Sequence, residues 1–238
     1  MIECNGNDER TDGKMSKKIS ASAAVTLIIT VVCLVASLCL GVLASKKSAE
    51  PHVFADAENS YAKDELIALY RDGIITGDPD GENIDLHPQS AVTRGEFVET
   101  LVRFFGISVE YYNEEYITYP DYPKLSQGVK SALSALSHYS LTDGVFPLAG
   151  YFSEDRAVTR REAALCIGKL ISGSRLDFDF TDMDEVPVSV AAQISGLLEK
   201  EIIIGFPDGT LRLDSELTRE QFALILTRFR SYTEKSKN

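Results

Sequence analysis

One helix start occurs three times in this 238-residue chain, and it restricts the possible folds more than any other feature. The copies are TRGE at 93–96, TRRE at 159–162 and TREQ at 218–221, so their first residues are 66 and 59 positions apart. Apolar residues follow at helical spacing, four, eight and eleven positions after each Thr. They are Phe97, Leu101, Phe104; Ala163, Ile167, Leu170; and Phe222, Leu226, Phe229. Helices of about 14 residues are unstable alone in water, so we expect these three to bury their apolar faces against one another.

Other positions repeat together with the helix start. An aromatic-x-Asp step lies upstream of each Thr, an apolar residue stands seven positions before it, and a glycine follows the first helix. The Asp residues are Asp56, Asp121 and Asp182; the apolar residues are Leu86, Phe152 and Leu211; the glycines are Gly77, Gly144 and Gly205. Each unit is therefore predicted to be a helix, a glycine-containing loop and a second helix.

Units one and three resemble S-layer homology (SLH) repeats. The resemblance is carried by GDPDG at 77–81 with LHPQSAVTRGEF at 86–97, and by GFPDGTLRLDSELTREQF at 205–222. It covers about residues 54 to 232, although the middle unit is degenerate: Ser140 replaces the first turn glycine and the P-D-G turn is missing. The resemblance implies an all-α, pseudo-threefold domain of three helix-loop-helix SLH repeats, with the three T-R-x-E helices as a central bundle.

The N-terminal part differs in character. Residues 19–45 contain no charged side chain, and this segment is long enough to form one transmembrane helix. A cleaved secretory signal is the alternative, since a small-residue cleavage site precedes Ser45. Both interpretations place residues 46–238 on the outer side of a membrane. We therefore expect a tail at 1–18, a membrane segment at 19–45, a linker at 46–53, SLH repeats at 54–108, 109–176 (degenerate) and 177–232, and a tail at 233–238.

Charge and motifs exclude several functions. From Glu50 onward, 18 Lys and Arg stand against 32 Asp and Glu, so the net charge is −14 and a nucleic-acid partner is excluded. Catalytic motifs such as G-x-S-x-G and H-E-x-x-H are missing, and the three repeats leave no room for a catalytic domain. The Asp78-Asp80-Gly81 segment lacks the spacing of a calcium loop. We expect no enzyme activity, no cofactor and no metal site.

The arginine in each helix start needs an explanation. Thr at the N-cap and Glu or Gln three residues later form a capping box. Arg94, Arg160 and Arg219 instead stand at the first helical position, where the helix dipole disfavours a cation. Each arginine is explained by a nearby anion, either the domain's own Asp56, Asp121 or Asp182, or a carboxylate on a ligand.

The resemblance implies binding of a secondary cell-wall polysaccharide, attached to peptidoglycan and often bearing pyruvate ketals, in grooves between units. The expected ligand-binding residues are Arg94, Arg160, Arg219, Asp56, Asp121, Asp182, Gly77 and Gly205. Because units one and three keep both motifs, Arg94 and Arg219 are expected to contribute more than Arg160. The expected protein is a non-catalytic tether between membrane and wall, single-pass with its SLH domain on the wall side, or secreted to the wall after cleavage. The alternative is a membrane-anchored protein-interaction module with this fold and no glycan site.

Overall fold

The computed structural model describes residues 54–109, 117, 119–146 and 150–237. These residues lie in one compact unit that extends from His52 to Asn238. The segments 1–18, 19–45 and 46–53, predicted to be a tail, a membrane helix and a linker, lie outside the described residues. None of the helices within the described ranges has the length and apolar character needed to span a membrane.

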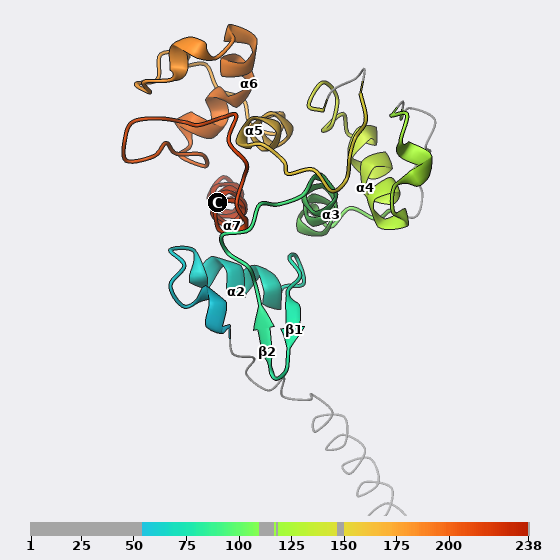
Figure 1. The fold of residues 1–238 in the computed structure, drawn as a ribbon. Coiled ribbons are helices and arrows are strands. Elements are labelled where there is room, and N and C mark those ends of the chain that lie inside the picture. The colour runs from blue at the N-terminus through green and yellow to red at the C-terminus, as the bar shows by residue number, and fades with distance from the viewer. Residues whose placement is uncertain (1–53, 110–116, 118, 147–149, 238) are drawn as a thin grey trace, which may run out of the picture. The chain divides into compact units, whose positions relative to one another are not determined.

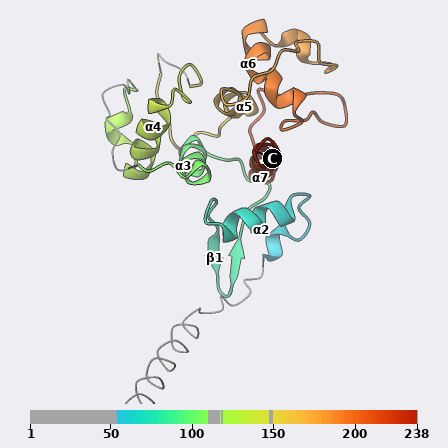
Figure 2. The same cartoon turned by 180° about the vertical axis from the view of Figure 1, so that it is seen from behind.

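The described residues form three units of the same construction, each with a short 3-10 helix, an outer α-helix and a central α-helix. Unit one contains η1 (Ala55–Ala57), α2 (Lys63–Arg71) and α3 (Arg94–Phe105). Unit two contains η3 (Tyr122–Lys124), α4 (Gln127–His138) and α5 (Arg160–Gly168). Unit three contains η4 (Met183–Glu185), α6 (Val188–Glu199) and α7 (Arg219–Lys235). Figures 1 and 2 show α3, α5 and α7 in the centre, with α2, α4 and α6 around them.

The predicted fold class, all-α with an N-terminal transmembrane helix, is wrong. Unit one contains a β-hairpin of strands β1 (Asp78–Asp80) and β2 (Asn83–Asp85), paired antiparallel with Pro79 opposite Ile84. A two-residue connection joins the strands, and its first residue, Gly81, takes the left-handed conformation with φ of 62°. The sequence indicated a P-D-G turn at this place; the connection in the structure is Gly81 and Glu82, and the strand pairing on either side of it was not predicted.

Each outer helix packs against the central helix of the preceding unit. The pairs are α4 on α3, α6 on α5, and α2 on α7, so unit one follows unit three and the arrangement closes on itself. A ring of three backbone hydrogen bonds joins the segments that lead into the central helices. Val92 N–H donates to the Leu217 carbonyl (2.8 Å), Leu217 N–H to Val158 (2.9 Å), and Val158 N–H to Val92 (2.9 Å). The three units are therefore interlocked rather than stacked.

The core extends across all three units and contains most of the predicted apolar positions. Phe97 and Phe222, at equivalent positions of α3 and α7, are buried with ring centroids 5.2 Å apart. Leu170 is the exception: it is 44 % exposed, because α5 ends at Gly168 and the residue lies beyond the helix. A Cβ at Gly168 would stand 2.5 Å from the Gln193 carbonyl oxygen, so this close helix contact requires glycine.

Candidate functional site

The amino ends of the central helices are closed by neighbouring segments of the protein. In α3, the N–H groups of Arg94 and Gly95 donate to the carbonyls of Arg156 and Glu154 in unit two, both at 2.8 Å. The next N–H, of Glu96, donates to the Thr93 hydroxyl, which confirms the predicted N-cap. The first three amides of α5 and of α7 have the same kinds of acceptor. In α5 they donate to the carbonyls of Ser215 and Leu213 and to the Thr159 hydroxyl. In α7 they donate to the carbonyls of Ser90 and Pro88 and to the Thr218 hydroxyl. An external anion therefore has no free amide at these three helix ends.

The capping box is complete only in α5 among the three central helices, where Glu162 accepts from the Thr159 N–H at 3.1 Å. The side-chain oxygens of Glu96 and Gln221 instead each accept a hydrogen bond from an arginine of another unit. The reciprocal half of the box predicted for α3 and α7 is therefore wrong.

The three repeated Asp side chains have a structural role. Each carboxylate accepts two consecutive backbone N–H groups of its own unit, for example those of Leu211 and Arg212 on Asp182, both at 2.8 Å. The second residue of each bonded pair is left-handed, with φ of 48° at His87, 55° at Ser153 and 51° at Arg212. Asp56, Asp121 and Asp182 therefore stabilise an unusual turn.

Burial raises the pKa of Asp182, but the hydrogen bonds from Leu211 and Arg212 outweigh it and hold that pKa below the ordinary value. The ionised carboxylate is consequently the form that stabilises the turn.

Each helix-start arginine reaches forward into the next unit. Arg94 of unit one pairs with Glu162 of unit two, and Arg219 of unit three pairs with Glu96 of unit one. Arg160 of unit two contacts the Gln221 amide oxygen of unit three at 3.3 Å. In each case the partner is the third residue of the next central helix, a contact that the spacing within a single repeat does not reveal.

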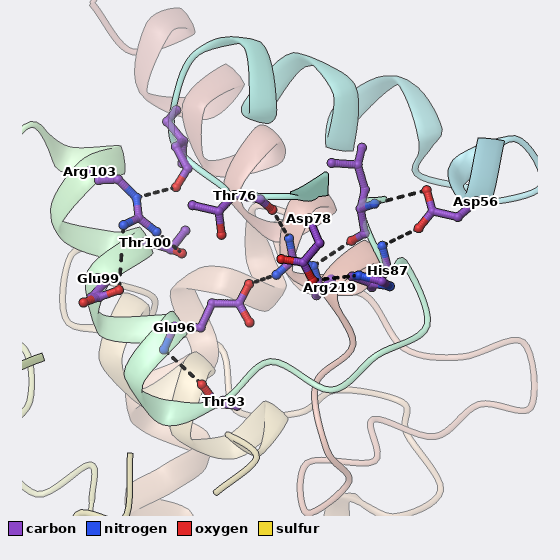
Figure 3. Close-up of polar contacts among 12 residues, drawn as sticks. Asp56, Thr76, Asp78, His87, Thr93, Glu96, Glu99, Thr100, Arg103 and Arg219 are labelled. Carbon is purple, nitrogen blue, oxygen red and sulfur yellow. Dashed lines mark hydrogen bonds and ion pairs between the residues drawn. The ribbon is translucent and has the colours of Figure 1, made fainter. Parts of the chain in front are cut away.

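The arginine–aspartate ion pair, one of the two alternatives from the sequence, is replaced by a bridge through the backbone of one residue. Arg219 Nε donates to the Leu86 carbonyl at 2.7 Å, while the Leu86 N–H donates to Asp56 at 3.1 Å. Figure 3 shows this chain of contacts from Asp56 to Arg219 and on to Glu96. Equivalent bridges link Arg94 to Asp121 through Phe152, and Arg160 to Asp182 through Leu211, so each arginine is linked to the Asp of the next unit. The Asp and Arg side chains thus lie close together, but they are linked through the backbone of an intervening residue rather than by a direct ion pair.

Arg94 is enclosed by protein. Its residue is 1 % exposed, its guanidinium makes two contacts with the Glu162 carboxylate, and Nη1 donates to the Phe152 carbonyl at 2.8 Å. The ring of Phe146 covers it at 5.3 Å. A ligand has no access to this side chain in the structure.

Arg160 lines a cavity of about 290 Å³ formed by all three units. Its Nε and Nη2 atoms donate to the carbonyls of Leu211 (3.0 Å) and Ile204 (3.2 Å), and its guanidinium stacks on the Phe206 ring at 4.8 Å. The other lining residues are Tyr61, Ile203, Gly205, Pro207, Gln221, Leu224, Ile225 and Arg228. We call this cavity the Arg160 groove; its lining contains two guanidinium groups and no carboxylate.

Arg219 lines a second, more polar cavity of about 420 Å³, here called the Arg219 groove. Its Nη2 donates to the Thr76 carbonyl and its Nη1 to Glu96 (Figure 3). The other lining residues are Thr93, Gly95, Glu99, Arg103, Ser126, Val129, Glu154 and Asp155.

Burial lowers the pKa of Arg160 and of Arg219, the two arginines that line the grooves. For Arg160, Tyr61 and Asp182 oppose this effect while the guanidinium groups of Arg212 and Arg228 add to it; for Arg219, the carboxylates of Asp78 and Asp56 oppose it. The lining of the Arg160 groove, which has two guanidinium groups and no carboxylate, is more electropositive than that of the Arg219 groove, although the chain from Glu50 onward is acidic.

Gly77 and Gly205 fix the carbonyls that these arginines contact, since they directly follow Thr76 and Ile204. A Cβ at Gly205 would stand 2.3 Å from the Phe180 ring, and one at Gly77 would stand 2.5 Å from Ile84. Gly205 also lines the Arg160 groove. Both glycines therefore allow a close approach that shapes a groove wall.

Sequence reasoning missed three groove residues: Tyr61, Phe206 and Arg228. A signal for Arg228 was present, because a basic residue stands ten positions after each repeated Thr, as Arg103, Lys169 and Arg228. Phe206 lies within the recognised GFPDG turn, where its aromatic character was not considered. Within the described residues, no cluster of His, Cys, Asp or Glu could hold a metal ion.

The family model of the S-layer homology domain matches residues 53–98 and 179–223. These segments include most of unit one and of unit three as far as the start of α7. No curated protein matches this chain. Two segments of the chain, in units one and three, thus match the S-layer homology domain. Such a domain is a module that binds cell-wall polymers rather than a catalytic domain, and it associates its protein with the cell envelope.

Proposed function

We propose that this protein binds a secondary cell-wall polysaccharide attached to peptidoglycan, on the wall side of the membrane, and that the Arg160 groove receives an anionic substituent such as a pyruvate ketal. The middle unit, residues 109–176, is included as a third, degenerate SLH repeat that supplies Arg160. The observation that carries the proposal is the partner of each arginine: Arg94 and Arg219 pair with glutamates, whereas Arg160 faces the neutral Gln221.

An external carboxylate would complete the Arg160 groove chemically. Three of the five guanidinium N–H donors of Arg160 are used by Leu211, Ile204 and Gln221, which leaves two. Arg228 makes no ion pair or hydrogen bond among the described residues, so a second cation lies beside the first. Tyr61, an exposed residue of the lining, adds ring surface against which a sugar ring can pack, whereas the Phe206 ring already carries the guanidinium groups of Arg160 and Arg212.

This proposal revises the expected ranking of the arginines. Arg160 becomes the ligand-contacting residue, with Gly205 in the groove wall. Arg94 and the three repeated Asp residues are assigned structural roles because their polar atoms are occupied by protein.

Co-sedimentation of the full-length chain with peptidoglycan sacculi tests the proposal. Binding is expected to intact sacculi and to be lost after acid stripping of the attached polysaccharide. Arg160→Ala is expected to weaken binding roughly ten- to a hundredfold, the effect of about 1.5–3 kcal/mol for a charge-assisted contact. Arg161→Ala is the matched control, because Arg161 follows Arg160 directly but pairs with Asp214 outside the groove. Binding to neither sample would instead favour a protein-interaction module.

A further inference from the structure

The Arg160 and Arg219 grooves are built from corresponding positions of successive units. In both grooves, the arginine Nε donates to the carbonyl of the apolar residue that stands seven positions before the Thr of the next unit. Its Nη2 donates to the carbonyl of the residue just before the turn glycine. Its Nη1 donates to the side-chain oxygen of the third residue of the next central helix. The corresponding pairs are Leu211 and Leu86, Ile204 and Thr76, and Gln221 and Glu96. The arginine is therefore held in the same way, and the two grooves differ chiefly in their other side chains.

Those side chains give the two grooves opposite charge. Gln221 and Leu224 in the Arg160 groove correspond to Glu96 and Glu99 in the Arg219 groove. Glu154 and Asp155 also line the Arg219 groove, which therefore holds four carboxylates against the guanidinium groups of Arg219 and Arg103. The Arg160 groove holds two guanidinium groups and no carboxylate.

A built-in carboxylate competes directly with a ligand carboxylate. Glu96 already forms a charge-assisted bond with Arg219, which is stronger than a bond to a neutral amide. A ligand anion would have to displace Glu96 and then lie among like charges, which is unfavourable. At Arg94 the carboxylate of Glu162 has the same effect and the site is buried as well.

We infer that the third residue of each central helix determines whether its groove accepts an anionic ligand: Gln221 leaves Arg160 available, whereas Glu96 and Glu162 satisfy Arg219 and Arg94 internally. This inference rests on the proposed function and narrows it. It makes the Arg160 groove, among the surroundings of the three arginines, the site for the anionic group and assigns Gln221 as the specificity-determining residue.

Gln221→Glu tests the inference with a nearly isosteric change. The new carboxylate would pair with Arg160 as Glu96 pairs with Arg219, so binding to sacculi that carry their polysaccharide should fall tenfold or more. Thermal stability should not fall, because the equivalent Arg–Glu pair already exists in this fold. Gln221→Leu is the comparison variant: it removes the amide without adding a carboxylate, so its binding should fall less than that of Gln221→Glu.

Glu96→Gln provides a second, independent test. It changes only the Arg219 groove, where Glu99, Glu154 and Asp155 still repel an anion, so binding to the same sacculi should stay within about twofold of the wild type. A tenfold loss of binding in the folded Glu96→Gln variant would overturn the inference. If Arg160→Ala has lost binding, wild-type binding by the folded Gln221→Glu variant would also overturn it. If Arg160→Ala also binds normally, the proposed function itself fails.

Discussion

Replacing Arg94 by Met tests the structural role of the buried arginine. The change keeps the volume of the side chain but leaves the Glu162 carboxylate, whose side chain is 11 % exposed, without its cation. Removing one partner of a buried ion pair costs about 3–5 kcal/mol. Glu162 keeps the N–H of Thr159, whereas the Phe152 carbonyl loses a donor, so we expect a value within this range. For a domain of this size, that loss lowers the melting temperature by roughly 6–20 °C.

Urea unfolding and thermal melting followed by circular dichroism measure the effect. Arg161→Ala is the control, because the Arg161–Asp214 pair lies at the surface and is worth about 1 kcal/mol or less. The double variant Arg94→Met with Glu162→Gln should lose less than the sum of the two single variants, since no carboxylate is then stranded. A loss below about 1 kcal/mol in Arg94→Met, or additive single effects, would refute the buried-pair interpretation.

Three further predictions follow from the helix caps, the close approach at Gly205 and the aspartate turns. Thr218→Ala should lower the free energy of unfolding by about 1 kcal/mol in urea titration, because the Gln221 N–H loses its acceptor. Gly205→Ala should lower it by about 1–3 kcal/mol, because the new Cβ would collide with Phe180; an unchanged melting temperature would contradict this. The folded-state pKa of Asp182 lies below 3.8, so its contribution to stability is present above that pH and is lost as the pH falls through the folded value. Urea midpoints should fall on acidification below about pH 4, and less steeply in Asp182→Asn.

Local sequence was sufficient to predict the central helices. Thr93, Thr159 and Thr218 are N-caps as predicted, and the helices begin at Arg94, Arg160 and Arg219. These features depend on side chains that contact amides three residues away, so a repeated four-residue pattern is enough to locate them. The hairpin of unit one was missed because its strands are only three residues long and carry no alternating pattern.

The partners of the arginines could not be predicted, because they lie in another unit. Arg219 contacts Glu96, 123 positions away in the chain, and Arg94 contacts Glu162, 68 positions away. The spacing within one repeat suggested the Asp of the same unit as the partner of each arginine. In the structure, the backbone of one residue links each arginine to the Asp of the next unit instead, as from Arg160 through Leu211 to Asp182.

The shift by one unit also explains why Arg160 was ranked lowest from the sequence. Arg160 belongs to the degenerate unit two, but the walls of its groove come mainly from unit three, which keeps the GFPDG turn with Gly205 and Phe206. The loss of the P-D-G turn in unit two therefore affects the surroundings of Arg94, which is buried against Glu162. A cation at a helix start is unfavourable for its own helix. In all three helices this cost is offset because the guanidinium joins two or three acceptors of the next unit. Our proposal is that the charge is left for a ligand where that unit supplies Gln221 in place of a glutamate.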